Sequence, residues 1–230
     1  MSDPRSPSKP DPSNLAQRTA ELHDALREFD PRFLAGRTGA TYVPVSPQQG
    51  SLHLHYWGRQ VSLTFPELIA RDGRTGERLG PLDEAMLAYY FTLSDGTPET
   101  GSWIAFSELP DGRFYAQAFQ GYTGAELTKA IGHDGDGFAA AAAAIQGQEV
   151  PSGAGLGDKA FAFRALPRVS ILIVCWLGDE DFPSSYRLLF DSAIRHHLST
   201  DACAILGGAL TRRLLAAYRP PDSTPAAAGN

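Results

Sequence analysis

Cysteine is scarce in this 230-residue sequence, and its scarcity excludes several classes of protein. Cys175 and Cys203 are the only cysteines, and no Cys-x-x-Cys pair occurs. A disulfide framework, a cysteine-rich zinc site and a self-contained iron–sulfur cluster are therefore excluded. Cys175 lies inside the most apolar run of the chain, where we expect it to pack as a small hydrophobic side chain.

Long hydrophobic runs are also missing. The longest, Val169–Leu177, has nine residues with a serine inside it, whereas a membrane-spanning helix needs about twenty. Residues 1–14 contain no apolar stretch of the kind that a secretory signal requires. We therefore expect a cytoplasmic protein without a membrane partner.

Positive charge is in the minority, since 20 Lys and Arg stand against 26 Asp and Glu, for a net charge of −6. This acidic balance argues against a nucleic-acid partner, because proteins that bind nucleic acids present a basic face. Of the basic residues, 17 are arginines and three are lysines. Arginine suits bidentate contacts to carboxylates and phosphates, but a codon bias would produce the same ratio.

Proline is concentrated at the two ends of the chain. Seven of the 17 prolines lie in residues 1–14 and 219–230, which predicts disordered tails around a single domain over residues 15–218.

The spacing of apolar residues in this domain predicts both helices and strands. Helices are expected over Leu15–Phe29, Asp83–Leu93, Thr123–Ile131, from Asp136 through the run of alanines, and from Ser199 onward; strands over Thr41–Val45, Leu52–Tyr56, Val61–Phe65, Lys159–Leu166, Val169–Leu177 and Tyr186–Phe190. We expect Asp83 and Asp136 to be helix N-caps, and Asp111-Gly112 to form a turn. Because short turns join neighbouring segments, we predict an α+β fold with an antiparallel sheet, hairpins and several packed helices.

Two segments of the sequence carry recognisable motifs. Residues 101–119 (GSWIAFSELPDGRFYAQAF) contain G-x-W-I-x-F-x-E-L-P-x-G, and residues 157–198 contain L-P-x-V, W-x-G-D-E-x-F-P and L-F-D-x-x-I. Both segments resemble an uncharacterised prokaryotic domain-of-unknown-function family, and the resemblance covers about residues 50–215.

The resemblance implies a shared fold but no catalytic residues. Some relatives join this domain to a four-cysteine iron–sulfur domain of the kind found with corrinoid proteins. The resemblance therefore implies a cofactor-related setting and a protein partner of the iron–sulfur or corrinoid type. Since this chain lacks those cysteines, any redox role would need a partner chain.

An acidic turn, Asp179-Glu180-Asp181, follows the strand Val169–Leu177. If that strand pairs with Tyr186–Phe190 as a hairpin, Asp191 lies at the opposite end, separated from the triplet by several residues of about 3.3 Å each. The triplet alone could hold a hard cation through its oxygens. The interpretation that we favour is a solvated turn in which a carboxylate accepts backbone N–H bonds.

His53 and His55 alternate with apolar residues on the predicted strand Leu52–Tyr56, so both imidazoles lie on one face. A strand presents two metal ligands at this spacing, and a third ligand such as Glu108 or His133 would have to come from elsewhere. A half-exposed sheet face that carries two histidines explains the same pattern, and we favour that interpretation.

Five aromatic residues flank Glu108: Trp103, Phe106, Phe114, Tyr115 and Phe119. These residues could form a pocket with a carboxylate inside it, or a packed core in which Glu108 holds a turn or pairs with an arginine. We favour the core. The candidate ligand or partner surface consists of six residues: Trp103, Glu108, Asp158, Asp179, Glu180 and Asp181.

No catalytic or phosphate-binding motif accompanies these candidates. The sequence contains no G-x-S-x-G elbow and no phosphate loop, and an EF-hand loop starting at Asp134 would have Ile145 where a Glu is needed. We therefore predict a non-catalytic accessory domain, either protein-interacting or cofactor-associated, with no cofactor of its own. The alternative is a metal- or small-cofactor-binding domain, or an enzyme, with a carboxylate or histidine site.

Overall fold

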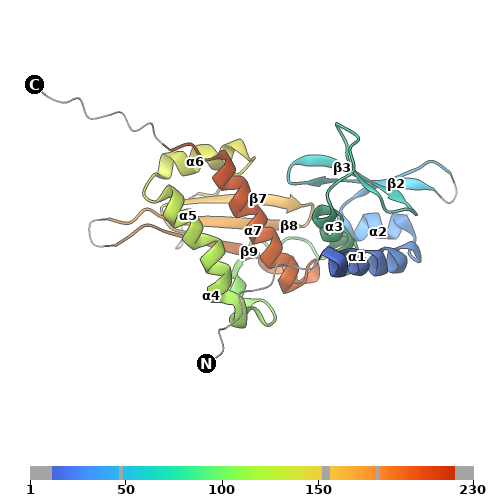
Figure 1. Cartoon of the computed structure of the whole chain (residues 1–230), viewed down its shortest axis with the longest axis horizontal. Helices are drawn as coiled ribbons and strands as arrows, with labels where there is room; N and C mark the ends of the chain where they lie inside the picture. The colour runs from blue at the N-terminus through green and yellow to red at the C-terminus, as the bar shows by residue number, and fades with distance from the viewer. Residues whose placement is uncertain (1–11, 47–48, 152–155, 180–181, 221–230) are drawn as a thin grey trace, which may run out of the picture. The chain divides into compact units, whose positions relative to one another are not determined.

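The fold consists of two antiparallel sheets with packed helices (Figure 1), which confirms the predicted α+β class. The computed structural model describes residues 12–46, 49–151, 156–179 and 182–220. Glu180 and Asp181 of the predicted acidic turn lie outside the described residues, as do most residues of both predicted tails. None of the described helices combines the length and the apolar character that crossing a membrane requires.

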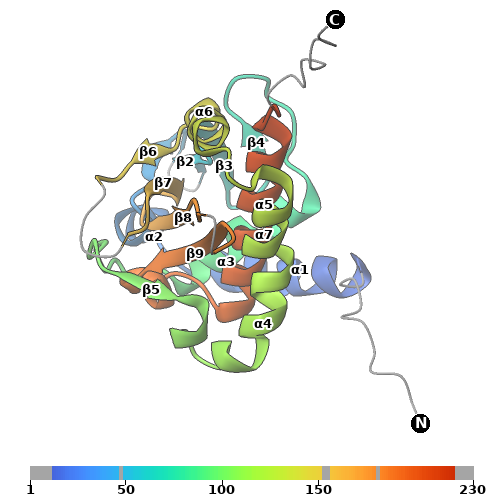
Figure 2. The same cartoon turned by 90° about the vertical axis from the view of Figure 1, so that its left-hand side faces the viewer.

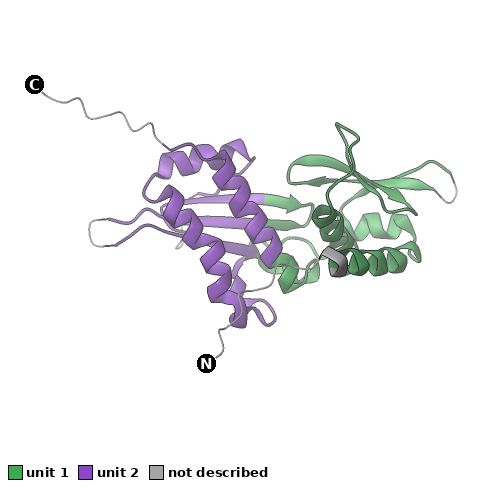
Figure 3. Cartoon of the chain, in the orientation of Figure 1, with its two compact units in different colours: residues 1–102, 164–170, 191–203 green, residues 103–163, 171–190, 204–230 purple. Residues whose placement is uncertain are grey.

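The chain divides into two compact units (Figure 3). Unit 1 comprises residues 1–102, 164–170 and 191–203, and unit 2 comprises residues 103–163, 171–190 and 204–230. Unit 1 takes two of its segments from the second half of the chain. Unit 1 is therefore discontinuous in sequence, and one continuous stretch of the chain does not reveal which residues belong to it.

Unit 1 contains a sheet in the order β1-β2-β3-β4 together with helices α1, α2 and α3. Their bounds are α1 Pro12–Arg27, α2 Pro31–Thr38, α3 Pro81–Leu93, β1 Thr41–Pro44, β2 Gly50–Tyr56, β3 Arg59–Phe65 and β4 Ala70–Asp72. The predicted hairpin is confirmed as β2 and β3, in which Leu54 lies opposite Val61. Apolar side chains such as Leu52 and Leu63 are buried, and more exposed polar side chains alternate with them.

The start of α3 differs from the prediction, and Asp83 is not its N-cap. The cap is Gly80, and Pro81 occupies the first helical position, where the N–H that proline lacks would have no partner within the helix. The Asp83 carboxylate instead accepts hydrogen bonds from the Tyr56 hydroxyl at 2.9 Å and the Arg59 guanidinium at 3.0 Å. These bonds tie α3 to the β2–β3 hairpin.

Unit 2 contains most of the second sheet, in which the strand order is β5-β9-β8-β7-β6. The helices and strands that lie wholly or mostly in unit 2 are β5 Trp103–Ala105, the 3₁₀ turn η1 Phe106–Glu108, α4 Gly112–Tyr122, α5 Gly124–Ile131, α6 Gly135–Ala144, β6 Gln148–Glu149, β7 Lys159–Leu166, β8 Val169–Trp176, β9 Ser185–Asp191 and α7 Thr200–Ala217. The 3₁₀ turn η2, Ser192–His196, belongs to unit 1. Helices α4, α5 and α7 lie along one face of this sheet (Figure 2). Strand β8 is buried almost throughout, and burial raises the pKa of the Cys175 thiol, as suits a packed side chain.

The N-cap predicted at Asp136 is also wrong. Asp134 caps α6, because its carboxylate reaches forward to accept the Gly137 N–H at 2.8 Å. Asp136 lies in the first turn of the helix and forms an ion pair with Lys159 at 2.9 Å, which lowers the pKa of the Asp136 carboxyl. The predicted turn at Asp111-Gly112 leads directly into α4.

His197 is fully buried in unit 1, and its ring bridges two loop positions. Nε2 lies 2.9 Å from the Thr97 carbonyl oxygen, to which it donates, and Nδ1 lies 3.2 Å from the Ser94 hydroxyl. Burial lowers the pKa of His197. Between the lowered folded-state pKa and the ordinary value of about 6.5, the unfolded chain binds more protons than the folded chain.

We therefore expect the unfolding free energy to decrease as the pH falls below about 6.5, with His197 responsible for part of the loss. Urea unfolding at pH 7.5 and pH 5.5 should show a smaller loss in His197→Gln than in the wild type. The exposed His55→Gln variant serves as the control and should retain the full loss. Equal losses in all three proteins would contradict the assignment to His197.

Candidate functional site

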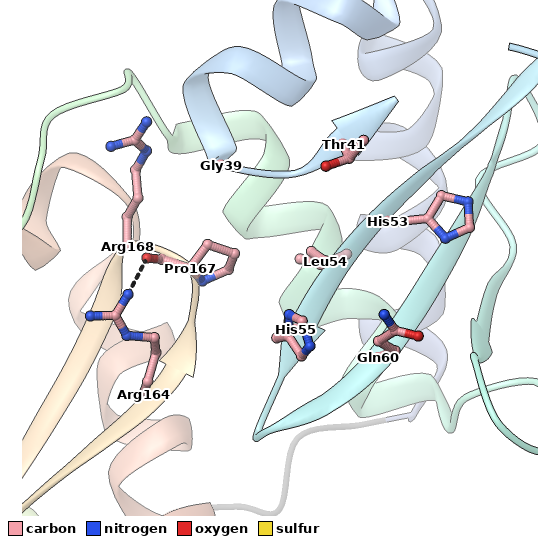
Figure 4. A pocket seen from close by; sticks show the side chains of 9 residues that line it. All are labelled: Gly39, Thr41, His53, Leu54, His55, Gln60, Arg164, Pro167 and Arg168. Atoms are coloured by element: carbon pink, nitrogen blue, oxygen red, sulfur yellow. Dashed lines mark hydrogen bonds between the residues drawn. The ribbon is translucent and has the colours of Figure 1, made fainter. Parts of the chain in front are cut away.

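The predicted histidine pair lines a pocket of about 530 Å³ whose described lining belongs entirely to unit 1 (Figure 4). Three segments form it: the end of α2 with the start of β1, strands β2 and β3, and the end of β7 with the turn that follows it. The first two segments are close in sequence, whereas the third comes from more than a hundred residues further along the chain.

Strands β2 and β3 form one wall of this pocket, which we call the histidine wall: His53, His55 and Gln60. The alternation of β2 places both imidazoles on its outer face, as predicted, and His55 lies opposite Gln60 in the β2–β3 register. The Ser51 hydroxyl lies 2.7 Å from Nε2 of His53. The wall therefore presents imidazole and amide groups, which can donate hydrogen bonds to an oxygen-rich ligand.

The end of β7 and the β7–β8 turn form the other wall, which we call the arginine wall: Arg164, Pro167 and Arg168. The Arg164 guanidinium donates to the Pro167 carbonyl at 3.4 Å and forms an ion pair with Glu99 at 2.7 Å. Arg168 donates through Nη2 to the Gly36 carbonyl at 3.3 Å. Its Nε is buried and has no hydrogen-bond partner in the described part of the chain.

Backbone contacts within unit 1 hold these walls in place. The Trp57 N–H at the β2–β3 turn donates to the Ala165 carbonyl at 2.9 Å. Gly39, which ends α2, adopts a left-handed φ of +70°. A Cβ at this position would lie 3.1 Å from Cβ of Pro167, so glycine allows both the conformation and the close approach.

The charge of the pocket is opposite to that of the chain. Its described lining contains two arginines and no Asp or Glu, whereas the chain has a net charge of −6. Glu99 neutralises part of the charge of Arg164, but Arg168 forms no ion pair with a described carboxylate. A concave site with fixed positive charge raises the local concentration of anions.

A metal site at His53 and His55 gains no support from this geometry. The described residues contain no group of three or more His, Cys, Asp or Glu side chains able to hold an ion. The third ligands that the sequence suggested are engaged in unit 2: Glu108 accepts the Ala105 N–H, and a ring nitrogen of His133 contacts the Leu177 carbonyl. The arginine wall would also repel a cation.

The acidic residues singled out from the sequence hold local backbone structure in unit 2. Glu108 accepts the Ala105 N–H at 2.6 Å and so closes the 3₁₀ turn, the turn-holding role anticipated for it. The aromatic core predicted around it is right for Phe106 and Phe119, which are buried, but wrong for Phe114 and Tyr115, which are exposed. Asp158 accepts the Leu177 N–H at 2.8 Å, and Asp179 accepts the Phe182 N–H at 2.9 Å, as in the favoured solvated turn.

Trp103 packs against an apolar cluster formed by Ala160, Leu172 and Val174. A ligand or partner surface at Trp103 and these acids stays a prediction, as does any part played by Glu180 and Asp181.

Sequence reasoning missed the arginine wall. The available signal was the excess of arginine over lysine, together with Arg164 near the end of a predicted strand and Arg168 in the tight turn after it. Neither feature indicates a partner for these side chains, because the histidine wall lies more than a hundred residues away in the sequence.

A family model described as a domain of unknown function (DUF3786) matches residues 30–213 of the chain. The matched span includes all three segments that line the pocket. No curated protein and no solved structure matches the chain.

Proposed function

The chain belongs to the DUF3786 family, a domain of unknown function, and from this premise we propose that it is a non-catalytic binding domain for a small anionic molecule. The proposal places the ligand in the unit 1 pocket. It is a more specific version of the cofactor-associated role predicted from the sequence, because many cofactors and metabolites carry phosphate or carboxylate groups.

One observation carries the proposal: two arginines and two histidines line a pocket without a carboxylate in its described lining. Guanidinium groups bind phosphates and carboxylates through paired N–H donors, and an imidazole donates in both of its protonation states. The volume of about 530 Å³ lies within the range of small-molecule sites, about 300–1,000 Å³.

The arginines and histidines of the pocket are suited to binding a ligand and not to catalysing a reaction on it. A hydrolase or transferase site would need an activated nucleophile and an oriented base. Ser51 and His53 are in hydrogen-bond contact, but no side chain of the described residues orients the His53 ring through its other nitrogen. A binding role also suits the accessory partnership with another protein that the sequence predicts, which remains part of the proposal.

Isothermal titration calorimetry of the full chain with inorganic phosphate, at low ionic strength, tests the proposal. We expect saturable binding at one site, and a loss of affinity of at least about tenfold in Arg168→Gln. Arg164→Gln removes a more exposed guanidinium and should also weaken binding, which guards against a folding defect at Arg168.

Arg74→Gln supplies a matched control, because Arg74 is an exposed arginine of unit 1 outside the pocket lining. It should bind phosphate as the wild type does. Absence of binding to phosphate, pyrophosphate and citrate alike would overturn the proposal, and so would equal affinities for the wild type and both pocket variants.

A further inference from the structure

The pocket has two separate sets of donors. In Figure 4 the arginine wall and the histidine wall lie on opposite sides of the space between them. His53 and His55 are two residues apart on β2, which spaces their backbone positions by about 7 Å. A single compact oxyanion bound at the guanidinium groups would leave most of the histidine wall without a ligand contact.

Donors of the histidine wall are uncommitted. Within the part of the chain that the structure describes, neither the His55 imidazole nor the Gln60 side-chain amide forms a hydrogen bond. His53 makes its recorded contact through Nε2, to the Ser51 hydroxyl. These groups can therefore serve a second oxygen-rich group on the same ligand.

The residues that line the pocket also indicate which kind of linker joins the two oxygen-rich groups of the ligand. Apart from the imidazoles, the described lining has no aromatic ring, and its apolar contribution comes from small or aliphatic residues such as Leu54 and Pro167. A nucleobase is usually held by stacking on an aromatic side chain. A short, non-aromatic linker fits this surface better than a nucleoside.

From these observations we infer that the ligand carries two anionic groups on a short aliphatic backbone, one bound at each wall. Bisphosphates and dicarboxylates share this chemistry. The inference rests on the proposed function, since it assigns a ligand class to the same pocket.

Two series of synthetic probes measure the spacing and separate the two sources of anionic groups. One series consists of α,ω-alkane bisphosphonates with one to six methylenes, and the other of alkane dicarboxylates of matching length. Linking two binding groups raises affinity only when the linker fits the span between the sites. We therefore expect the affinity to pass through a maximum with length, at least about tenfold above that of methylphosphonate or acetate.

Two variants assign the two ends. His55→Ala removes an exposed donor of the histidine wall and should weaken binding of the best two-headed probe several-fold more than it weakens binding of methylphosphonate. Arg168→Gln should weaken binding of both probes. The series with the tighter maximum identifies the anionic group as phosphate-like or carboxylate.

The outcomes distinguish the inference from the proposed function. If single-headed and two-headed probes bind equally, or if His55→Ala affects both equally, the two-point inference is wrong and the anion pocket stands. If AMP binds more tightly than every probe of both series, the ligand is a nucleotide and the inference is also wrong. If no probe binds, the proposed function fails and the inference fails with it.

Discussion

Replacing Asp191 by alanine is expected to lower the unfolding free energy by about 3 kcal/mol, because hydrogen bonds to a charged acceptor are each worth about 1.5–3 kcal/mol. The Asp191 side chain is buried within unit 1. Its carboxylate accepts backbone N–H bonds from Thr100 at 3.1 Å, Gly101 at 2.7 Å and Ala193 at 2.9 Å. It therefore holds the chain before β5 against the turn that follows β9.

Urea denaturation measures this effect, and two further variants test its cause. Asp191→Asn retains one acceptor oxygen and should lose less stability than Asp191→Ala. Asp179→Ala removes an exposed carboxylate that accepts the Phe182 N–H at 2.9 Å, and should cost below about 1 kcal/mol. If Asp191→Ala and Asp179→Ala cost the same, the hydrogen bonds of Asp191 do not stabilise the fold as inferred here.

Replacing Phe138 by alanine is expected to lower the unfolding free energy by about 3–5 kcal/mol, the usual cost of emptying a buried aromatic site. Phe138 is fully buried in unit 2. Its ring packs edge-to-face against Phe161 and Tyr186, with centroid distances of 5.2 Å and 5.3 Å. Helix α6 is otherwise built largely of alanines, so this ring is its main anchor to strands β7 and β9.

Phe114 provides the matched control, because it is also a helical phenylalanine of unit 2 but is 84% exposed. Phe114→Ala should change the unfolding free energy by less than about 0.5 kcal/mol. Near-ultraviolet circular dichroism should change in Phe138→Ala, as the environment of Tyr186 is altered. A Phe138→Ala protein within about 1 kcal/mol of the wild type would show that α6 is not anchored by this ring.

Strands and helices with strong periodicity were predictable from the sequence. In one strand, apolar residues alternate with histidines: Leu52, Leu54 and Tyr56 with His53 and His55. Only one strand register buries the three apolar side chains, because a shift of one residue would turn them toward water. The predicted strands over residues 159–166, 169–177 and 186–190 are found as β7, β8 and β9 within a residue or so. The local order of apolar and polar residues decides which side chains of a strand are buried, so the sequence is enough to predict such a strand.

Helix starts were less predictable, since several polar residues compete for each cap. Asp134 and Asp136 are both suitable N-caps by type, and the contacts around them decide between the two. The Tyr218 hydroxyl, from the far end of the chain, donates to Asp134 at 3.0 Å, whereas Lys159 engages Asp136. At Asp83, the Tyr56 hydroxyl and Arg59 guanidinium likewise occupy a carboxylate that could otherwise have capped the helix.

The sequence by itself determined the α+β class, the β2–β3 hairpin and the common face of His53 and His55, because each follows from the spacing of neighbouring residues. Only the tertiary structure decided which residues share a pocket with that face. The sequence suggested that the two histidines are metal ligands or part of an exposed sheet face. Neither interpretation included the arginines on the other side of the pocket. Folding brings Arg164 and Arg168 to that place, and the charge of a site is set by every group facing it, whatever the distance along the chain.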